Sequence, residues 1–252
     1  MADGATEFLA GNTPAAPRVG FAPVDALLAP EALEFRPPLL QSRFPRSRSQ
    51  LQSSTRVVGG TSKRAFDIFV AGSALLALSP FLLGVWALVR IDSPGPGLFR
   101  QRRGGFEGRP FRILKFRTMK TCESRTITQA RETDSRTTAF GRFLRKYSID
   151  ELPQLINVLK GDMSIIGPRP HALAHDRQFH GVDRRYRFRH CARPGITGLA
   201  QVSGSRGPTQ TREQIVERLE HDLAYVSNWS WKRDISIFFR TIAVLSSDRS
   251  AF

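Results

Sequence analysis

Two adjacent carboxylates, Asp150 and Glu151, are the residues of this sequence best suited to chemistry. The 252-residue chain carries 38 Lys+Arg against 22 Asp+Glu, a formal charge of +16, so acidic side chains are scarce. Leu152 and Pro153 follow the pair, and then come apolar residues at helical spacing: Leu155, Ile156 and Leu159. A carboxylate at the N-terminal end of a helix is held ionised by the helix dipole and by free N–H groups. The pair is therefore either a reactive group or a helix cap.

The residues around the pair predict how a helix would position it. A residue before proline is pushed out of the α region, so we expect Leu152 to lie outside the helix and Pro153 to open it. Gly161 is expected to end this helix, and the three apolar residues to form its buried face. Ser148 and Glu151 also have the spacing of a capping box, which is the structural alternative to a catalytic role.

The positive charge lies almost entirely after residue 62. Residues 1–62 have a net charge of only +1 and many Pro, Ala, Ser, Gln and Arg, which predicts a mostly disordered tail with a short helix near Val24–Leu28. The N-terminus lacks a basic region followed by an apolar run, so no secretory signal is predicted. The basic remainder suits an anionic partner: nucleic acid, an acidic membrane surface or a phosphate-bearing substrate. Cys122 and Cys191 have no metal-site spacing and are expected to be structural, in a reducing compartment.

Residues 68–89 run for 22 positions without a charge. A straight helix of that length covers about 33 Å, enough to cross a bilayer core. Ser79 and Pro80 lie in its middle, where proline removes a backbone hydrogen bond and a serine can satisfy the freed carbonyl. Both flanks are basic, so the positive-inside tendency gives no orientation. These features favour a re-entrant helix over a spanning or a buried soluble one, and we assign 63–92 to it and 93–252 to the domain that follows.

Residues 90–120 carry nine Lys/Arg and predict two short strands, Leu98–Gln101 and Pro110–Thr118, with a hairpin around Gly104–Gly108. Lys115 and Arg117 belong to a basic face that is either directed at phosphate or is a solvated, charged sheet edge. We assign both residues to the binding of substrate phosphate. Interleaved phenylalanines would also suit nucleic acid. No helix-turn-helix, zinc-knuckle or RNP-type motif accompanies them, however.

Three further segments have amphipathic patterns. Residues 137–147 place apolar side chains at i, i+3, i+4 and i+7 beside basic ones, and predict a helix that lies in a membrane interface. Residues 212–226 predict a second helix, with Thr211 and Gln214 as a capping box. The stretch 228–245 places tryptophans beside basic residues on a broad apolar face, which suits a membrane interface or a packed helix.

Two segments after residue 170 give weaker indications of structure or function. His171, His175 and His180 include an i, i+4 pair, but no third ligand motif accompanies it, so we expect surface residues and not a metal site. The glycine-rich residues 193–204 predict a structured loop with a turn.

Several motifs, in order, resemble the bacterial sugar transferases, which are monotopic phosphoglycosyl transferases. They run from about Lys63 to Leu245, so they cover most of the chain outside the tail. One of them would be weak evidence, whereas the ordered series is specific. The motifs are KRAFDI, the apolar run with Ser79-Pro80, KFRTM (115–119), GRFLRKYSIDELPQLINVLKGDMSIIGPRP, RPGITGLAQVSG and the NWS-x-x-x-D that ends at Asp234.

The resemblance implies a mainly α monotopic membrane protein with a small β element and interfacial helices. Members transfer a sugar-1-phosphate from a UDP-sugar to polyprenyl (undecaprenyl) phosphate at the cytoplasmic face of the bacterial inner membrane, which releases UMP and begins exopolysaccharide or other glycoconjugate synthesis. On this likeness Asp150 is the nucleophile that forms a covalent phosphosugar intermediate, and Glu151 binds Mg²⁺. Arg145 and Arg169 sit near phosphate, and Ser79-Pro80 breaks the re-entrant helix.

Two alternative hypotheses assign the protein to other functional classes. The first is a basic nucleic-acid-binding protein, which leaves the apolar run unexplained, so no nucleic acid partner is expected. The second is a membrane scaffold without chemistry, suggested by the amphipathic helices. The sequence names neither the UDP-sugar nor the pathway, and it leaves homo-oligomerisation open.

Overall fold

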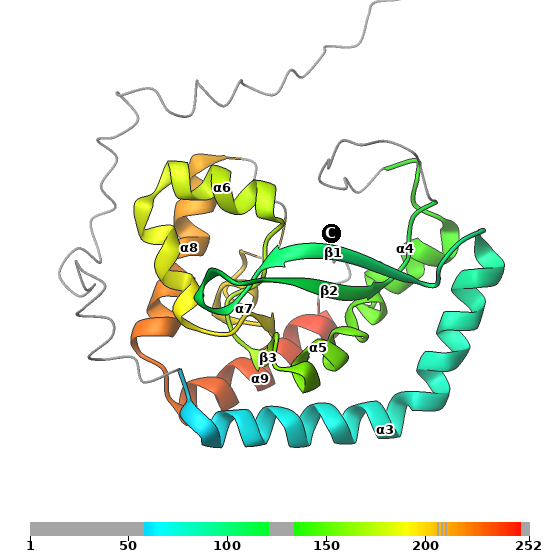
Figure 1. The fold of residues 1–252 in the computed structure, drawn as a ribbon, viewed down its shortest axis with the longest axis horizontal. Coiled ribbons are helices and arrows are strands. Elements are labelled where there is room, and N and C mark those ends of the chain that lie inside the picture. Colours follow the sequence, from blue (N-terminus) through cyan, green and yellow to red (C-terminus); the bar gives the residue numbers. More distant parts are fainter. Residues whose placement is uncertain (1–57, 121–133, 206, 208, 210, 248–252) are drawn as a thin grey trace, which may run out of the picture. The chain divides into compact units, whose positions relative to one another are not determined.

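The computed structural model describes residues 58–120, 134–205, 207, 209 and 211–247. Most of the predicted tail, its short helix near Val24–Leu28 and Cys122 lie outside these residues. The described part is mainly helical with two small two-stranded sheets, as expected for the fold class (Figure 1).

Helix α3 (Gly60–Asp92) contains the whole apolar run and changes direction partway along its length (Figure 1). Pro80 lies inside it. Proline has no N–H for the carbonyl four residues back, here that of Leu76, and this carbonyl accepts a hydrogen bond from Ser79 Oγ at 2.8 Å. We attribute the bend to Pro80. The hydroxyl of Ser79 therefore satisfies the carbonyl that Pro80 frees.

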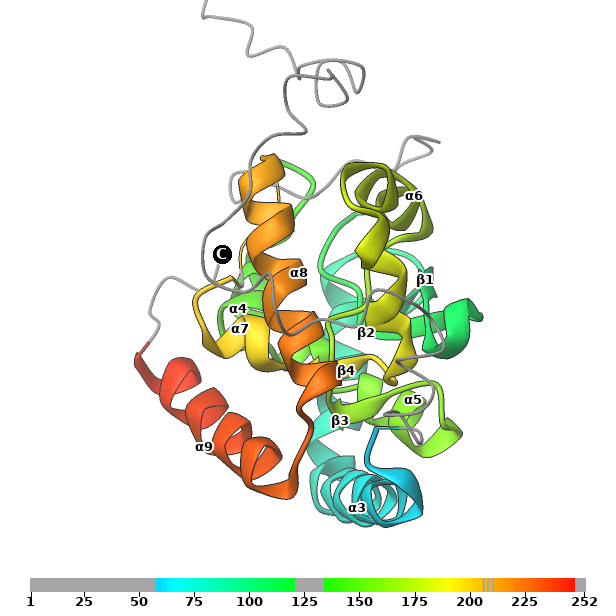
Figure 2. The ribbon, with the colours of Figure 1, turned by 90° about the vertical axis from the view of Figure 1, so that its left-hand side faces the viewer.

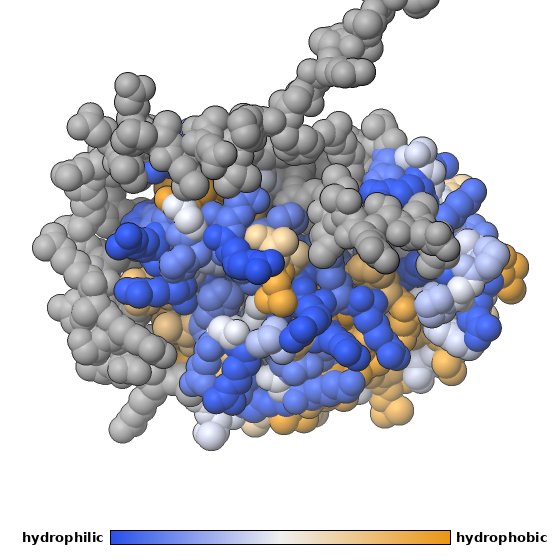
Figure 3. All heavy atoms as spheres, turned by 45° about the horizontal axis from the view of Figure 1, so that its top comes forward, coloured by the Kyte–Doolittle hydropathy of each residue, from blue (hydrophilic) through white to orange (hydrophobic). Residues whose placement is uncertain are grey.

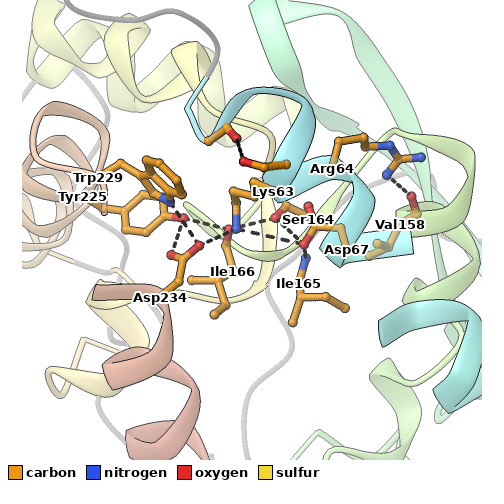
Figure 4. Close-up of polar contacts among 12 residues, drawn as sticks. Lys63, Arg64, Asp67, Val158, Ser164, Ile165, Ile166, Tyr225, Trp229 and Asp234 are labelled. Carbon is orange, nitrogen blue, oxygen red and sulfur yellow. Dashed lines mark hydrogen bonds and ion pairs between the residues drawn. The ribbon is translucent and has the colours of Figure 1, made fainter. Parts of the chain in front are cut away.

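The first turns of α3 are held by a buried ion pair between Lys63 and Asp234 (Figure 4). Lys63 Nζ lies 2.7 Å from Asp234 Oδ2, and both side chains are almost fully buried. Asp234 also accepts hydrogen bonds from Tyr225 Oη at 2.9 Å and from Trp229 Nε1 at 3.0 Å. Because each of its oxygens has a donor, the buried carboxylate is compensated. It ties the start of α3 to the last helix, α9 (Trp231–Ser247).

One turn further along α3, Asp67 is fixed to strand β3 (Ser164–Ile166). Its Oδ1 accepts hydrogen bonds from Ser164 Oγ and from the Ile165 N–H, each at 3.1 Å (Figure 4). At the other end of α3, Val85 and Val89 are buried in a cluster that the following elements complete. Both ends of α3 therefore pack against the same folded unit.

The middle of α3 is exposed and apolar. Leu76 is 80% exposed, Phe69 72% and Leu83 67%. By length and composition this helix could cross a membrane, and only 11% of its most apolar window is buried. Figure 3 shows hydrophilic residues over much of the described part of one face, with hydrophobic residues gathered mostly along its lower and right margins.

Strands β1 (Leu98–Gly104) and β2 (Pro110–Phe116) form the predicted antiparallel hairpin, joined through the short 3-10 turn Phe106–Gly108. The first strand is three residues longer than the prediction. In the register, Lys115 lies opposite Phe99. Residues opposite one another point to the same face, and so do residues four apart along a strand. Lys115 and Arg103 therefore share one face of the hairpin.

Helix α4 (Ala139–Lys146) confirms the predicted amphipathic helix at 137–147. The Thr138 side chain caps it by accepting a hydrogen bond from the Gly141 N–H at 2.9 Å. Leu144 is fully buried against the end of α3, while Phe143 and Tyr147 are 50% and 55% exposed. The helix thus keeps an aromatic and basic face free of the core.

The segment after α4 differs from the prediction in three respects. Leu152 lies in the α region (φ −56°, ψ −34°) despite the proline that follows, because the 3-10 turn Ile149–Glu151 continues into helix α5 (Gln154–Lys160). Ser148 makes no capping hydrogen bond, since its backbone is left-handed (φ 54°), so the predicted capping box is wrong. The buried face is Gln154, Leu155, Asn157 and Val158, whereas Leu159 is 38% exposed. Gly161 ends the helix at φ 90°, as predicted.

Residues 193–204, predicted as a loop, contain strand β4 (Gly195–Thr197) and the short helix α7 (Leu199–Val202). Strand β4 pairs in parallel with β3. The strands approach so closely that a Cβ on Gly195 would lie 2.1 Å from the Gly167 nitrogen. This packing explains why glycine stands there.

The remaining helices are α6 (Leu173–Val182), the 3-10 segment Arg184–Cys191, α8 (Arg212–Ser227) and α9. Figure 2 shows α9 and α3 at the lower end of the described unit, with α8 and α6 above them. The predicted capping box of Thr211 and Gln214 is present on α8. On α9 the apolar face is largely exposed, at Ile235, Phe238, Phe239, Ile242 and Leu245. His171, expected on the surface, is buried, with 7% of its surface exposed.

Candidate active site

Asp150 and Glu151 lie in the 3-10 turn Ile149–Glu151, between the end of α4 and the start of α5. The left-handed backbone of Ser148 sets the direction in which this turn leaves α4. Such a conformation costs a residue other than glycine about 1–2 kcal/mol. Strain of this kind is most often retained at functional sites. The turn directs both carboxylates into the described unit, where Asp150 is 8% exposed.

Glu151 is paired with two cations at once. Its Oε1 lies 2.7 Å from Lys115 Nζ and 2.5 Å from an Arg169 nitrogen, and its Oε2 accepts from the other terminal nitrogen of Arg169 at 3.1 Å. Burial opposes ionisation of this carboxyl, but Arg169 and Lys115 together hold its pKa well below the usual range. Glu151 is therefore a carboxylate with positive charge on both oxygens.

The pKa of Asp150, the preceding residue, is shifted in the opposite direction. Burial raises the pKa of Asp150 to about 6, Lys115 and Arg145 oppose the rise, and the Glu151 carboxylate adds to it. Two adjacent carboxyls whose pKa values are pushed apart are suited to different roles. A carboxylate with few donors and a raised pKa is the more nucleophilic of the two.

Arg145, in the last turn of α4, is oriented by Thr118. Its Nε donates to Thr118 Oγ1 at 2.9 Å. Burial lowers the pKa of the Arg145 guanidinium, and the charge of Asp150 counteracts that effect. The structure thus brings four of the predicted residues together around Asp150: Glu151, Lys115, Arg145 and Arg169.

Arg117 is placed differently. Its guanidinium donates to the main-chain carbonyls of Val89, Ser93 and Pro94, at 3.3, 2.5 and 2.5 Å, where α3 ends. Ser93 and Pro94 lie beyond the last turn of α3, so their carbonyls have no partners within the helix, and a buried arginine satisfies them. Ser79 and Pro80, predicted as the helix break, lie at the bend of α3 and not in the site.

A buried asparagine that sequence reasoning missed joins the two halves of the site. Asn157, on α5, accepts the Leu114 N–H at 2.9 Å and donates to the Arg112 carbonyl at 2.8 Å. It therefore pairs with β2 as a neighbouring strand would, and it fixes the distance between the turn that carries Glu151 and the strand that carries Lys115. The available signal was a polar residue, Asn157, between the apolar residues Leu155 and Val158 of this short helix.

The loop that carries Arg169 has its own supports, which were also missed. Arg189 donates to the Arg169 carbonyl at 2.5 Å and is anchored by the buried carboxylate of Asp222 at 2.8 Å. Arg103 donates to the Pro170 carbonyl at 3.3 Å, and the Gly104 N–H to the His171 carbonyl at 3.2 Å. This loop is therefore held from β1, from the 3-10 segment and from α8.

No group of three or more His, Cys, Asp or Glu side chains suited to a metal ion occurs within the described ranges. Mg²⁺ commonly needs only one or two carboxylates, with waters and substrate phosphate oxygens completing its octahedral shell. The neighbouring carboxylates of Asp150 and Glu151 fit that requirement, provided that Lys115 and Arg169 yield an oxygen of Glu151.

Comparison with known proteins identifies the family to which the chain is similar. The family described as bacterial sugar transferase matches residues 58–248. The UDP-glucose:undecaprenyl-phosphate glucose-1-phosphate transferase of Escherichia coli (strain K12) is 50% identical over 181 residues, which are 71% of this chain and 39% of the relative. The protein of the same name from Caulobacter vibrioides is 47% identical over 198 residues, 78% of this chain and 74% of the relative.

A third relative has a name that specifies a different sugar. The UDP-N-acetylgalactosamine-undecaprenyl-phosphate N-acetylgalactosaminephosphotransferase of Aeromonas hydrophila is 42% identical over 184 residues, 73% of this chain and 43% of the relative. Similarity of this degree therefore does not identify the sugar. The match over residues 58–248 includes α3, the hairpin and every residue of the site. The chain belongs to the bacterial sugar transferase family.

Proposed function

We propose that this protein transfers a sugar-1-phosphate from a UDP-sugar to polyprenyl phosphate, giving UMP and a polyprenyl diphosphate-linked sugar. The observation that carries the proposal is the pair of carboxyls with divergent environments, Asp150 buried with few donors and Glu151 held by Lys115 and Arg169. The names of the relatives support the same donor and acceptor classes.

In the first step a carboxylate oxygen of Asp150 attacks the β-phosphorus of the UDP-sugar. A bond forms between that oxygen and the phosphorus, the bond to the bridging oxygen breaks, and UMP leaves with the electron pair. In the second step an oxygen of polyprenyl phosphate attacks the same phosphorus and releases the Asp150 carboxylate. Phosphoryl transfer depends on positioning and on neutralised charge, which Lys115, Arg145 and Arg169 provide around Asp150.

Glu151, with Asp150 beside it, would hold the Mg²⁺ that the family resemblance implies. When bound, the ion masks the negative charge of the phosphoanhydride, so that an anionic nucleophile can approach. The contribution of Glu151 is to hold positive charge next to the nucleophile, whether that charge comes from Lys115 and Arg169 or from the ion.

We further infer that α3 enters the membrane and returns on the same side. Its two ends pack against one folded unit, through Lys63 and Asp67 at the start and through Val85 and Val89 at the end. A folded unit cannot lie on both sides of a bilayer, so a helix whose two ends it contacts is re-entrant. The exposed apolar face of α9 supports a site at the membrane surface, beside lipid phosphate. We propose the cytoplasmic face of the inner membrane, because the family resemblance implies that side.

Priming of exopolysaccharide or another glycoconjugate is the proposed role. One relative is named for exopolysaccharide production: a Rhizobium leguminosarum protein 46% identical over 185 residues, 71% of this chain and 92% of that protein. The alternatives of a nucleic-acid-binding protein and a non-catalytic scaffold are less favoured, since the relatives' names specify transferases.

The test uses the full chain purified in detergent, with undecaprenyl phosphate and a panel of UDP-sugars. We expect one or a few UDP-sugars to yield UMP and a lipid-linked product, and Asp150→Asn to abolish both. Exchange of labelled UMP into the UDP-sugar without lipid acceptor reports the covalent step, and it should be lost in the same variant. Asp92→Asn, at an exposed position, is the control. Transfer that survives Asp150→Asn unchanged would remove the assignment of the nucleophile, and absence of exchange would favour direct displacement.

A further inference from the structure

Two arginines beside the site, Arg103 and Arg218, are enclosed without a carboxylate partner. Arg169 and Arg189 are paired with Glu151 and Asp222, but neither Arg103 nor Arg218 has an ion pair in the part of the chain that the structure describes. The Nε atoms of both are buried and have no hydrogen-bond partner there. Arg218, on α8, is only 7% exposed. A buried cation without an anion is costly, so such groups call for an explanation.

The direct contacts that these arginines make are with uncharged groups, and carboxylates act on them only without an ion pair. Arg103 donates to the Pro170 carbonyl at 3.3 Å. Arg218 donates to the carbonyls of Ser205 and Gly207, at 2.6 and 2.5 Å. Carbonyl oxygens orient a guanidinium but carry no net charge. Burial, together with the nearby positive charge of Arg169, lowers the pKa of both arginines to about 10. Asp222 opposes this effect at Arg218, and Glu151 and Asp176 oppose it at Arg103.

A neutral histidine, His171, lies beside these arginines. Tyr186 Oη donates to Asp176 at 2.6 Å, so at its 2.5 Å contact with His171 Nδ1 it accepts, and the histidine carries its hydrogen on Nδ1. The Nε2 atom of His171 is then an acceptor and faces Arg218 at 3.5 Å. Burial, with four surrounding arginines, holds the pKa of His171 well below its usual range. His171 therefore adds no positive charge and leaves the guanidinium groups available to an anion.

Arg103 lies on the same face of the hairpin as Lys115 but further from Glu151. Lys115, which contacts Glu151, lies opposite Phe99 in the hairpin. Arg103 is four residues from Phe99 on the same face, so the main-chain positions of Phe99 and Arg103 are about 13 Å apart. The Arg169 loop lies between Lys115 and Arg103, since Arg169 contacts Glu151 and the next carbonyl accepts from Arg103. In an in-line transfer the nucleotide leaves on the side of the β-phosphorus opposite the attacking oxygen. Arg103 is held by the Arg169 loop on the side away from Lys115, and could contact the nucleotide there.

We propose that Arg103 and Arg218, together with Arg169, form an anion subsite that binds the phosphate of the departing nucleotide. The inference rests on the proposed function and adds residues from β1 and α8 to it. Arg169 is shared, because it can contact both phosphates of the donor. The subsite stabilises the charge that develops on the leaving group, and it is filled after the first step by the monophosphate of UMP.

The test compares the binding of UMP and of uridine to the full chain in detergent by calorimetry. Arg103→Gln and Arg218→Gln should each weaken UMP binding about tenfold or more, because a charged hydrogen bond to phosphate is lost, and leave uridine binding within about twofold. Arg218→Lys, which keeps the charge, is the second variant if Arg218→Gln does not fold. Arg102→Gln is the matched control, since Arg102 is adjacent to Arg103 but exposed on the other face of the hairpin.

The possible outcomes distinguish failure of the proposed subsite from failure of the proposed function. A merely structural role predicts that UMP and uridine lose affinity by the same factor, or that UMP binding is unchanged, and either result would overturn the proposal. Release of UMP from UDP-sugars by the wild-type protein is measured in the same preparations. Wild-type protein that releases UMP while Arg103→Gln binds it normally refutes the subsite alone. Wild-type protein that neither releases nor binds UMP refutes both.

Discussion

Lys115 and Arg117 lie two residues apart at the end of β2, yet their side chains have different partners. Lys115 Nζ lies 2.7 Å from the Glu151 carboxylate, whereas the Arg117 guanidinium is bound to three carbonyls at the end of α3. One basic residue therefore faces the proposed chemistry, and the other holds the membrane helix to the hairpin. Both had been predicted to bind phosphate, and variants at the two positions test this division of labour.

Lys115→Gln is expected to reduce sugar-phosphate transfer by at least about tenfold, with an unfolding temperature close to that of wild type. Removal of one cation leaves both oxygens of Glu151 hydrogen-bonded to Arg169, so the largely buried carboxylate keeps a counter-charge. Arg117→Gln is expected to lower the free energy of unfolding by about 1–3 kcal/mol, because buried carbonyls lose their donor. Thermal unfolding in detergent and initial rates of UMP formation check both variants.

If both variants lost activity to the same extent with unchanged stability, the structural role assigned to Arg117 would be wrong. Arg117 would then belong to the active site. Arg112→Gln serves as the control, because Arg112 is exposed on the same strand and only its main chain makes a described hydrogen bond. Its activity and unfolding temperature are expected to match those of wild type.

The raised pKa of Asp150 predicts how activity depends on pH. A nucleophilic carboxylate must be ionised, and burial places its pKa at about 6. The rate of UMP formation at low substrate should therefore be constant above about pH 7 and fall about tenfold per unit well below pH 6. A rate that remains constant down to pH 4.5 would show that Asp150 is not the titrating nucleophile.

The raised pKa of Asp150 also predicts that this residue, when ionised, lowers the stability of the protein. The folded-state pKa lies above the unfolded value of about 3.9, so the folded state binds the proton more tightly. Asp150 therefore lowers stability above pH 6, by at most about 3 kcal/mol, and this penalty fades as the pH falls toward 4. Asp150→Asn should raise the unfolding temperature at pH 7.5 and have little effect near pH 4. A lower unfolding temperature at pH 7.5 would contradict this account.

The sequence was sufficient for features that depend on local rules. The bend at Pro80, the hairpin, the amphipathic α4 and the capping box of α8 all follow from residue types at fixed spacing. The clustering of Asp150, Glu151, Arg145 and Arg169 was expected from the resemblance alone. Nothing in their spacing showed that Lys115 would complete this cluster.

The features that were missed depend on tertiary contacts. His171 was predicted to lie on the surface because no third ligand motif accompanies the histidine pair, but Tyr186 and Arg218, from two other elements, enclose it. Leu152 was predicted outside the α region because of Pro153, and the 3-10 turn overrides that local preference. Partners far along the chain decide both outcomes, and one sequence does not reveal them.

The ion pair between Lys63 and Asp234 is expected to be a main support of the membrane helix. Asp234→Asn leaves the buried lysine with only the longer contact to Asp67, at 4.0 Å, and should cost about 3–5 kcal/mol of stability. Lys63→Met should cost a similar amount, because it leaves the buried Asp234 carboxylate without a cation. The double variant should cost less than the sum of the two, which a double-mutant cycle in detergent measures. Strict additivity would show that the pair does not interact. Lys232→Met, at an exposed position on α9, is the control.

The re-entrant course of α3 predicts that both of its ends are accessible from one side of the membrane. After Cys122 and Cys191 are replaced by serine, cysteines are introduced at Ser62 and Asp92, which are exposed at either end of the helix. In inside-out vesicles, a membrane-impermeant maleimide should label both positions, as it labels a cysteine at exposed Ser230. In right-side-out vesicles it should label none of the three.

Labelling of Ser62→Cys and Asp92→Cys from opposite sides would refute the re-entrant helix, and it would also require that the contacts at one end of α3 be broken in the membrane. Pro80→Ala sharpens the experiment, because it restores the N–H that the Leu76 carbonyl lacks and favours a straight helix. The packing of both ends on one folded unit opposes straightening. We therefore expect Pro80→Ala to keep the labelling pattern and to lower the unfolding temperature.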